Sequence, residues 1–188
     1  MPADPLEAGA WLQTSAREVA LALNLVPFAG IAFMWFIGVL RDRLGTQEDQ
    51  FFATVFLGSG LLFLGMLFVA AAATGGLVLA YSVQPKALFD GGTFAFARAF
   101  IFNLMHIYAF KMAAVFMISA STLAIRTHIT ARWIALLGYI SAVSLLLGSD
   151  YFDRVLLVFP AWVLLVSTYI LVDNLRGSSH MVRKDEER

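Results

Sequence analysis

Residues 51–73, FFATVFLGSGLLFLGMLFVAAAA, contain no charged side chain. About 20 such residues are enough for an α-helix to cross the roughly 30 Å hydrocarbon core of a bilayer. Four other apolar segments approach or exceed this length: residues 19–40, 101–125, 133–149 and 155–172. The segment at 133–149 is the shortest, and the one that begins at Phe51 could extend to Val83. The sequence therefore predicts an all-α, polytopic transmembrane helical bundle of about five spans.

The composition supports a membrane location. Of the 188 residues, 60% are hydrophobic and 14% are charged, whereas soluble domains have about 45–50% apolar and about 25% charged residues. A water-soluble fold of this length could not bury so much apolar surface, so we expect the excess to face lipid. The chain has no cysteine, which excludes thiol nucleophiles, thiolate metal sites and disulfides.

The distribution of Lys and Arg predicts an orientation, because cytoplasmic loops are enriched in these residues. With five spans, eight of the thirteen basic residues fall on one side: Arg41, Arg43, Arg126, Arg132, Arg176, Arg183, Lys184 and Arg188. Four lie on the other side, namely Arg17, Lys86, Arg98 and Arg154. We therefore expect the N-terminus outside and the C-terminus in the cytoplasm.

Three kinds of segment follow from this topology. Residues 1–18 are expected to form an extracytoplasmic interfacial segment, and residues 19–173 a single transmembrane domain. Within that domain, residues 84–100 are expected to form an outer loop whose aromatic side chains, such as Phe94, lie at the headgroup boundary. Residues 174–188 are expected to form a charged cytoplasmic tail.

The third span, IFNLMHIYAFKMAAVFMISASTLAI, is the most polar. His106 shares one side of an ideal helix with Ala109, Ala113 and Ala120, small residues that let helices approach closely. Asn103 lies one turn above His106, and Asn24 in the first span lies at a similar depth. These three polar side chains could form a ligand or partner site. The alternative, which we favour, is that they form interhelical hydrogen bonds worth about 1 kcal/mol each.

Lys111 lies near the centre of the same span. A charge at that depth costs at least several kcal/mol unless it is paired, hydrated or neutralised. Every acidic residue lies outside the five spans, and Asp150 and Asp153 could reach Lys111 only if their loop dipped inward. The counter-charge could instead come from another chain, a lipid headgroup or a bound anion, or the side chain could extend to an interface.

Small residues in the fourth span suggest helix packing more than chemistry. They are Gly138, Ser141, Ser144 and Gly148. We predict no catalytic residue, metal site or cofactor, because the spans contain a single histidine and no paired carboxylates. Signatures of nucleic-acid binding are absent from the sequence as well.

The stretch VPFAGIAFMWFIGVLRDRLG, followed by EDQFFATVFLGSGLLFL, covers residues 26–64. It resembles small polytopic membrane proteins of unknown function from high-GC bacteria. The resemblance implies a multi-pass protein of the bacterial cytoplasmic membrane, and it supplies neither an activity nor site residues. In such proteins another apolar helix typically precedes the first span, and a shortened chain here would explain an outside N-terminus.

Three functions remain open at this stage. The first is a non-catalytic accessory or assembly subunit of a larger membrane complex, whose partners would be the bilayer and another membrane protein. The second is a small homo-oligomeric transporter or channel that moves an anion or protons past Lys111 and His106. The third is a membrane enzyme or a sensor.

Overall fold

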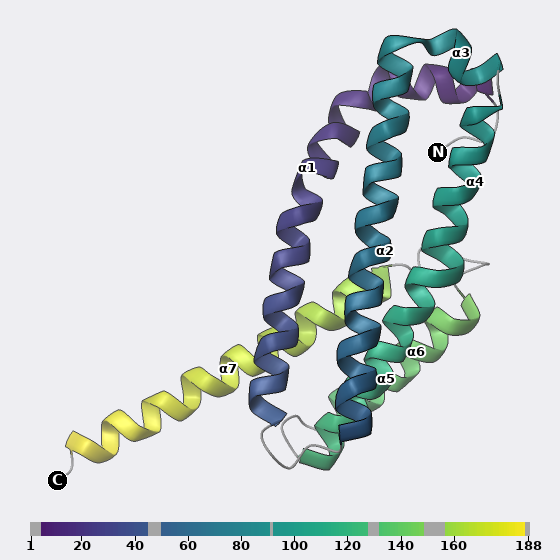
Figure 1. Cartoon of the computed structure of the whole chain (residues 1–188). Coiled ribbons are helices and arrows are strands. Elements are labelled where there is room, and N and C mark those ends of the chain that lie inside the picture. The colour runs from purple at the N-terminus through teal and green to yellow at the C-terminus, as the bar shows by residue number, and fades with distance from the viewer. Residues whose placement is uncertain (1–4, 45–49, 91, 128–131, 149–156, 187–188) are drawn as a thin grey trace. The chain divides into compact units, whose positions relative to one another are not determined.

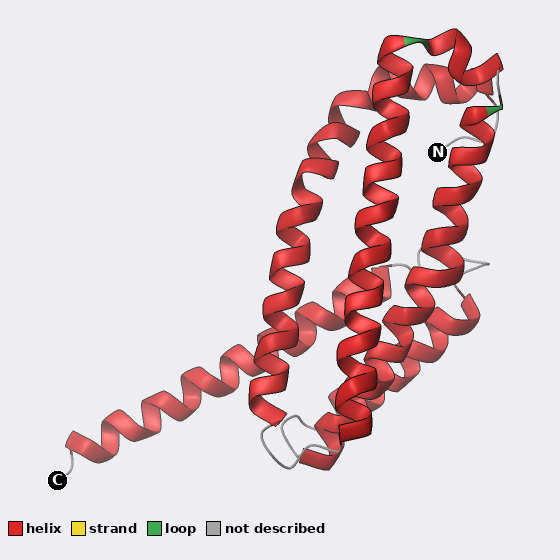
Figure 2. Cartoon of the chain, in the orientation of Figure 1, coloured by secondary structure: helices red, strands yellow, loops and turns green. Residues whose placement is uncertain are grey.

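The structure is a computed structural model that describes residues 5–44, 50–90, 92–127, 132–148 and 157–186. Side chains are described over 14–43, 51–89, 92–127, 132–148 and 157–175. The elements are all helices: α1 (Pro5–Leu44), α2 (Gln50–Val83), α3 (Pro85–Asp90), α4 (Thr93–Asn103), the π-helix η2 (Leu104–Ala109), α5 (Phe110–Thr127), α6 (Arg132–Gly148) and α7 (Val158–Glu186). Figures 1 and 2 show this arrangement, and the predicted all-α fold is confirmed.

Four helical stretches are long and apolar enough to cross a membrane. They are Thr14–Arg43, Phe51–Val83, Thr93–Thr127 and Val158–Leu175. The third joins α4, η2 and α5 into one continuous helix of 35 residues. The predicted span at 133–149 corresponds to α6, an apolar helix of 17 residues. At 1.5 Å per residue α6 is about 25 Å long, which is shorter than a typical hydrocarbon core.

The segment at 84–100 was expected to be a loop and is instead largely helical. α3 begins at Pro85, where the missing N–H of proline is no loss, and α4 begins at Thr93. Between them Gly92 has a φ of 70°, a left-handed conformation that glycine adopts without strain. The turn therefore lies at Gly92, and the third span begins eight residues earlier than expected.

Both ends of the chain are also helical where they are described. α1 starts at Pro5 and continues without interruption through Pro27. Figure 1 shows its first turns lying across the direction of the rest of the helix. At the other end, α7 continues beyond Leu175 to Glu186, so the backbone of the predicted tail extends the last helix.

The chain divides into two compact units, which we describe separately. The first contains residues 1–38 and 58–112, and the second contains residues 39–57 and 113–188. In the first unit, α1 and α2 approach closely at Gly30, where an added Cβ would lie 2.4 Å from the ring of Phe68. The rings of Phe33 and Phe63 meet edge to face 5.6 Å apart beside this contact.

A separate apolar cluster joins α2, α3 and α4 in the first unit. Leu77, Leu88 and Phe94 are each less than 5% exposed and form its centre. Phe94, which was expected at the headgroup boundary, is buried within this unit, because the turn at Gly92 directs the start of α4 back against α3.

The core of the second unit is built around Phe116 of α5, which is fully buried. Its ring stacks on Phe56 of α2 at 4.7 Å and meets Trp162 of α7 edge to face at 6.4 Å. α5 and α6 are joined by a hydrogen bond of 2.7 Å between the hydroxyls of Thr122 and Tyr139.

Several predicted cytoplasmic segments meet at one end of the second unit. The guanidinium of Arg43, near the end of α1, forms an ion pair with Asp173 of α7 at 3.2 Å and donates to the carbonyl of Ile170 at 3.3 Å. Arg126, near the end of α5, lies over the ring of Phe52 at the start of α2, 4.7 Å from its centroid. The ends of α1, α5 and the apolar part of α7 therefore share one end of this unit with the start of α2.

The contact between α5 and α6 generates a stability prediction. A Cβ on Gly138 would lie 2.0 Å from the Oγ atom of Ser121, and Ser121 is only 1% exposed. Gly138→Ala should therefore lower the free energy of unfolding by about 1–3 kcal/mol, as overpacked cores usually do. The measurement is thermal unfolding in detergent, followed by circular dichroism.

Two further variants show whether Gly138→Ala destabilises the protein through a steric clash or because any glycine-to-alanine change in these helices is harmful. Adding Ser121→Ala should restore part of the loss, because it removes the closest clashing oxygen but leaves Nε1 of Trp162 at 2.9 Å from the new Cβ. Gly65→Ala is the matched control, since nothing lies within 4 Å of a Cβ at that position. Equal losses at Gly138 and Gly65 would contradict the steric explanation.

Candidate functional site

The third span is interrupted by a π-helix that contains His106. η2 covers Leu104–Ala109, and at its end the N–H of Phe110 donates to the carbonyl of Met105, five residues earlier. An α-helix would use the carbonyl four residues earlier. Short π-helical turns within α-helices are rare and occur frequently at functional sites. This interruption marks the neighbourhood of His106 as the first place to look for function.

The imidazole of His106 is held between two phenylalanine rings of its own helix. The ring of Phe102 stacks on it with centroids 4.0 Å apart and planes inclined by 16°. Phe110 meets the imidazole edge to face at 6.1 Å. These contacts fix the orientation of a polar ring within an apolar span.

The hydrogen bonds of His106 determine which of its nitrogens is available. Nδ1 lies 3.1 Å from the backbone carbonyl of Phe102. Because a carbonyl oxygen only accepts, Nδ1 carries the proton in this contact and the neutral ring has a lone pair on Nε2. Nε2 is buried and has no hydrogen-bond partner in the part of the chain that the structure describes. It can accept a hydrogen bond or a proton from a group that is supplied from elsewhere.

Lys111 is half-buried five residues further along the same helix. Among the described residues, none forms a hydrogen bond or an ion pair with its ammonium group. Asp150 and Asp153, the acids considered from the sequence, lie outside the described residues. The third span therefore contains two polar groups without a hydrogen-bond partner among the described residues, the ammonium of Lys111 and Nε2 of His106.

The other two candidate residues, Asn24 and Asn103, form no hydrogen bond with His106 or Lys111. Asn24 is exposed, and its side-chain nitrogen donates to the carbonyl of Ala20 in its own helix at 3.0 Å. Asn103 is exposed at the end of α4, where its side chain makes no capping hydrogen bond. No hydrogen bond connects any pair among Asn24, Asn103, His106 and Lys111, all of which are described. Among the described residues, hydrogen bonds therefore do not join the predicted cluster of Asn24, Asn103 and His106, and Lys111 is not hydrogen-bonded to it.

The residues predicted to pack helices fall into two groups. Ala109, Ala113 and Ala120 are at most 6% exposed, and Gly138 is buried against Ser121. The remaining three, Ser141, Ser144 and Gly148, are half-buried. The hydroxyl of Ser144 donates to the carbonyl of Ile140 in its own helix. Its hydroxyl donor therefore needs no partner on a neighbouring helix.

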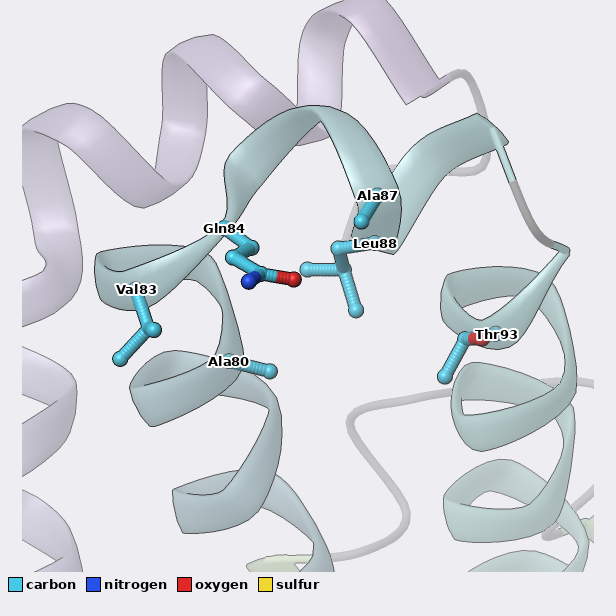
Figure 3. Close-up of a pocket in the computed structure, with 6 residues that line it drawn as sticks. All are labelled: Ala80, Val83, Gln84, Ala87, Leu88 and Thr93. Carbon is cyan, nitrogen blue, oxygen red and sulfur yellow. The ribbon is translucent and has the colours of Figure 1, made fainter.

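A pocket of about 250 Å³ lies where α2, α3 and α4 meet, and no sequence pattern indicated it. Figure 3 shows the amide of Gln84 and the side chain of Leu88 directed toward each other below α3. The pocket is lined by Ala80, Val83, Gln84, Ala87, Leu88 and Thr93, none of which is titratable. One amide and one hydroxyl offer no acid, base or nucleophile pair, so this pocket suggests binding more than catalysis.

The described residues also contain no group of three or more His, Asp or Glu side chains placed to hold a metal ion. His106 is therefore the best-defined reactive group of the site. The chemistry that its geometry allows is that of a single oriented acceptor, with a lysine on the next turn of the same helix.

The orientation of His106 generates a spectroscopic prediction. In protein labelled with ¹⁵N-histidine and reconstituted in lipid, the neutral imidazole of His106 should be protonated on Nδ1 and unprotonated on Nε2, since Phe102 holds the Nδ1 proton. Solid-state NMR shifts of the two nitrogens report this directly. The signal is assigned by its loss in His106→Gln, and a proton on Nε2 in the neutral ring would contradict the prediction.

No protein-family model, curated protein or solved structure matches this chain. The resemblance of residues 26–64 to small bacterial membrane proteins therefore stays a prediction.

Proposed function

We propose that this chain is a non-catalytic integral membrane protein that serves as an accessory or assembly subunit of a larger membrane complex. The observation that carries the proposal is the pair of polar groups in the third span, Lys111 and Nε2 of His106, which have no partner among the described residues. A second membrane protein that supplied an acceptor to Lys111 and a donor to His106 would satisfy both.

The depth of Lys111 argues against its reaching water alone. It lies within one residue of the midpoint of the apolar helix Thr93–Thr127. If the centre of that helix is at the centre of a roughly 30 Å core, about 15 Å separates Lys111 from either interface. Lysines that extend to an interface are found near helix ends, whereas charges at the centre face a partner or a water-filled space.

The outer surfaces of the spanning helices support the same proposal. In the four apolar windows only 22–33% of residues are buried within this chain. Polar side chains occur on the exposed surface, including Asn103 and Tyr108, which flank His106. Exposed amide and phenol groups within an apolar helix are typical of surfaces that hydrogen-bond to another helix.

A homo-oligomeric transporter or channel is the second candidate. It is favoured by the unpartnered Nε2 of His106, which could accept a proton, and by half-buried Lys111 five residues further along, which could attract an anion. In that case the partner would be another copy of this chain, and His106 and Lys111 would line the path between copies.

We also propose that the protein resides in the bacterial cytoplasmic membrane, with its N-terminus outside and its C-terminus in the cytoplasm. The basis is the excess of basic residues in the segments around Arg43, Arg126 and the tail. The contacts of Arg43 with Asp173, and of Arg126 with Phe52, place these helix ends together and are compatible with that assignment.

The subunit proposal is tested by purifying the tagged chain from its native membrane in mild detergent and counting its partners by native mass spectrometry. A second membrane protein should be recovered in a fixed ratio. Lys111→Met together with His106→Leu should release it, since truncating one side of a buried polar contact costs about 2–5 kcal/mol of association free energy.

The matched control for this experiment is Lys86→Met, which removes an exposed lysine of α3 and should leave the partner bound. A lone monomer would contradict both candidate functions. A homo-oligomer that Lys111→Met with His106→Leu dissociates would favour the transporter over the subunit.

The orientation is tested with single cysteines, which the cysteine-free chain makes unambiguous. Arg41→Cys and Asn174→Cys should react with a membrane-impermeant thiol reagent only after the cells are opened. Lys86→Cys should react in intact cells. Labelling of Arg41→Cys in intact cells would reverse the proposed orientation.

A further inference from the structure

An open groove lies between Trp133, at the start of α6, and residues of α7, all of them in the second unit. Its volume is about 470 Å³, and its lining is Trp133, Leu164, Leu165, Thr168, Tyr169 and Val172. The hydroxyl of Thr168 donates to the carbonyl of Leu164 at 2.8 Å, so its hydrogen-bonding capacity is largely used within α7. The wall of the groove is therefore almost entirely apolar.

We propose that this groove binds one anionic phospholipid, with an acyl chain along α7 and the phosphate beside Arg132. The proposal concerns a surface separate from His106 and Lys111 and does not depend on the function proposed above.

The length of the groove favours an acyl chain over a partner helix. From Leu164 to Val172 it extends along α7 for about 12 Å at helical rise. Val172 lies in the last turn of the apolar window Val158–Leu175. The groove thus begins near the edge of the hydrocarbon and covers most of one leaflet, which is about 15 Å thick. A transmembrane helix of a partner would need a contact surface along the whole span.

Charges next in sequence to the groove residues favour an anionic headgroup. Arg132 directly precedes Trp133, is exposed, and forms no ion pair or hydrogen bond with any residue that the structure describes. Asp173 directly follows Val172 and is already paired with Arg43. Arg132 is therefore a cation beside the groove lining that is free to pair with a lipid phosphate.

Two aromatic residues of the groove lining are suited to the level of the lipid headgroups. Trp133 is 55% exposed at the start of α6, and Tyr169 is half-buried in the groove wall. Tryptophan and tyrosine are enriched at the level of lipid headgroups, where an apolar ring and a polar edge are both accommodated. The phenol of Tyr169 can donate to a phosphate or glycerol ester oxygen.

The test compares phosphatidylglycerol with phosphatidylcholine of identical acyl chains, each titrated into the purified full chain in detergent. Lipid retention by native mass spectrometry and thermal unfolding are the two measurements. Phosphatidylglycerol should bind saturably, with one lipid retained, and about fivefold more tightly than phosphatidylcholine, the factor expected from one arginine near a headgroup. Arg132→Gln should remove this preference, whereas Arg41→Gln, at an exposed arginine of α1, should preserve it.

A second pair of variants tests the position of the acyl chain. Leu164→Trp adds bulk to the groove wall and should weaken the binding of both lipids at least fivefold. Leu147→Trp, at an exposed leucine of α6 outside the groove, should not. If Leu164→Trp unfolds without lipid, Trp133→Leu serves in its place and should also weaken the binding of phosphatidylglycerol.

Three results would overturn the proposal. Equal affinity for the two lipids in the unmodified chain would exclude recognition of the headgroup. Unchanged binding in both Leu164→Trp and Trp133→Leu would exclude the groove. Stabilisation by inorganic phosphate equal to that by phosphatidylglycerol would show an anion site that needs no acyl chain.

Discussion

In hydrocarbon a polar group has no water to bond to, so the backbone and the side chains must satisfy their hydrogen bonds within the protein. Six hydroxyls in the described helices meet this constraint by donating to the carbonyl four residues earlier. They belong to Thr74, Ser119, Thr122, Thr127, Ser144 and Thr168. The amide of Asn24 donates to a carbonyl of its own helix in the same way. These seven polar side chains thus need no neighbouring helix to satisfy a donor.

His106 and Lys111 do not follow this pattern completely, and neither does Ser121, whose buried hydroxyl has no hydrogen-bond partner among the described residues. His106 satisfies Nδ1 on its own helix, yet its buried Nε2 and the ammonium of Lys111 find no partner in the described part of the chain. Unpaired polar groups at membrane depth carry a large free-energy cost. The π-helix around His106 adds a second irregularity in the same place, since it replaces regular α-helical hydrogen bonds. Both features support our proposal that another molecule supplies the missing hydrogen-bonding groups.

The apolar runs predicted most of the fold, because length and hydropathy determine where a membrane helix can form. Residues 51–73 lie within α2, and the small Gly138 does pack against a neighbouring helix. The π-helix could not be predicted, because placing His106 and Ala109 on one face assumed a constant rotation per residue. The burial of Phe94 could not be predicted either. Its burial depends on the left-handed turn at Gly92 and on contacts with Leu77 and Leu88, which no local pattern encodes.

The ion pair of Arg43 and Asp173 shows how charge and topology are connected at the end of the second unit. Asp173 has a side chain that is 57% exposed, so the pair itself contributes at most about 1 kcal/mol to stability. Its larger effect is electrostatic, because it neutralises an acid at the edge of the apolar part of α7. This supports our proposal that Arg132 is left to attract an anionic headgroup. In that proposal the positive surplus that predicts a cytoplasmic end also gives that end a preference for anionic lipids.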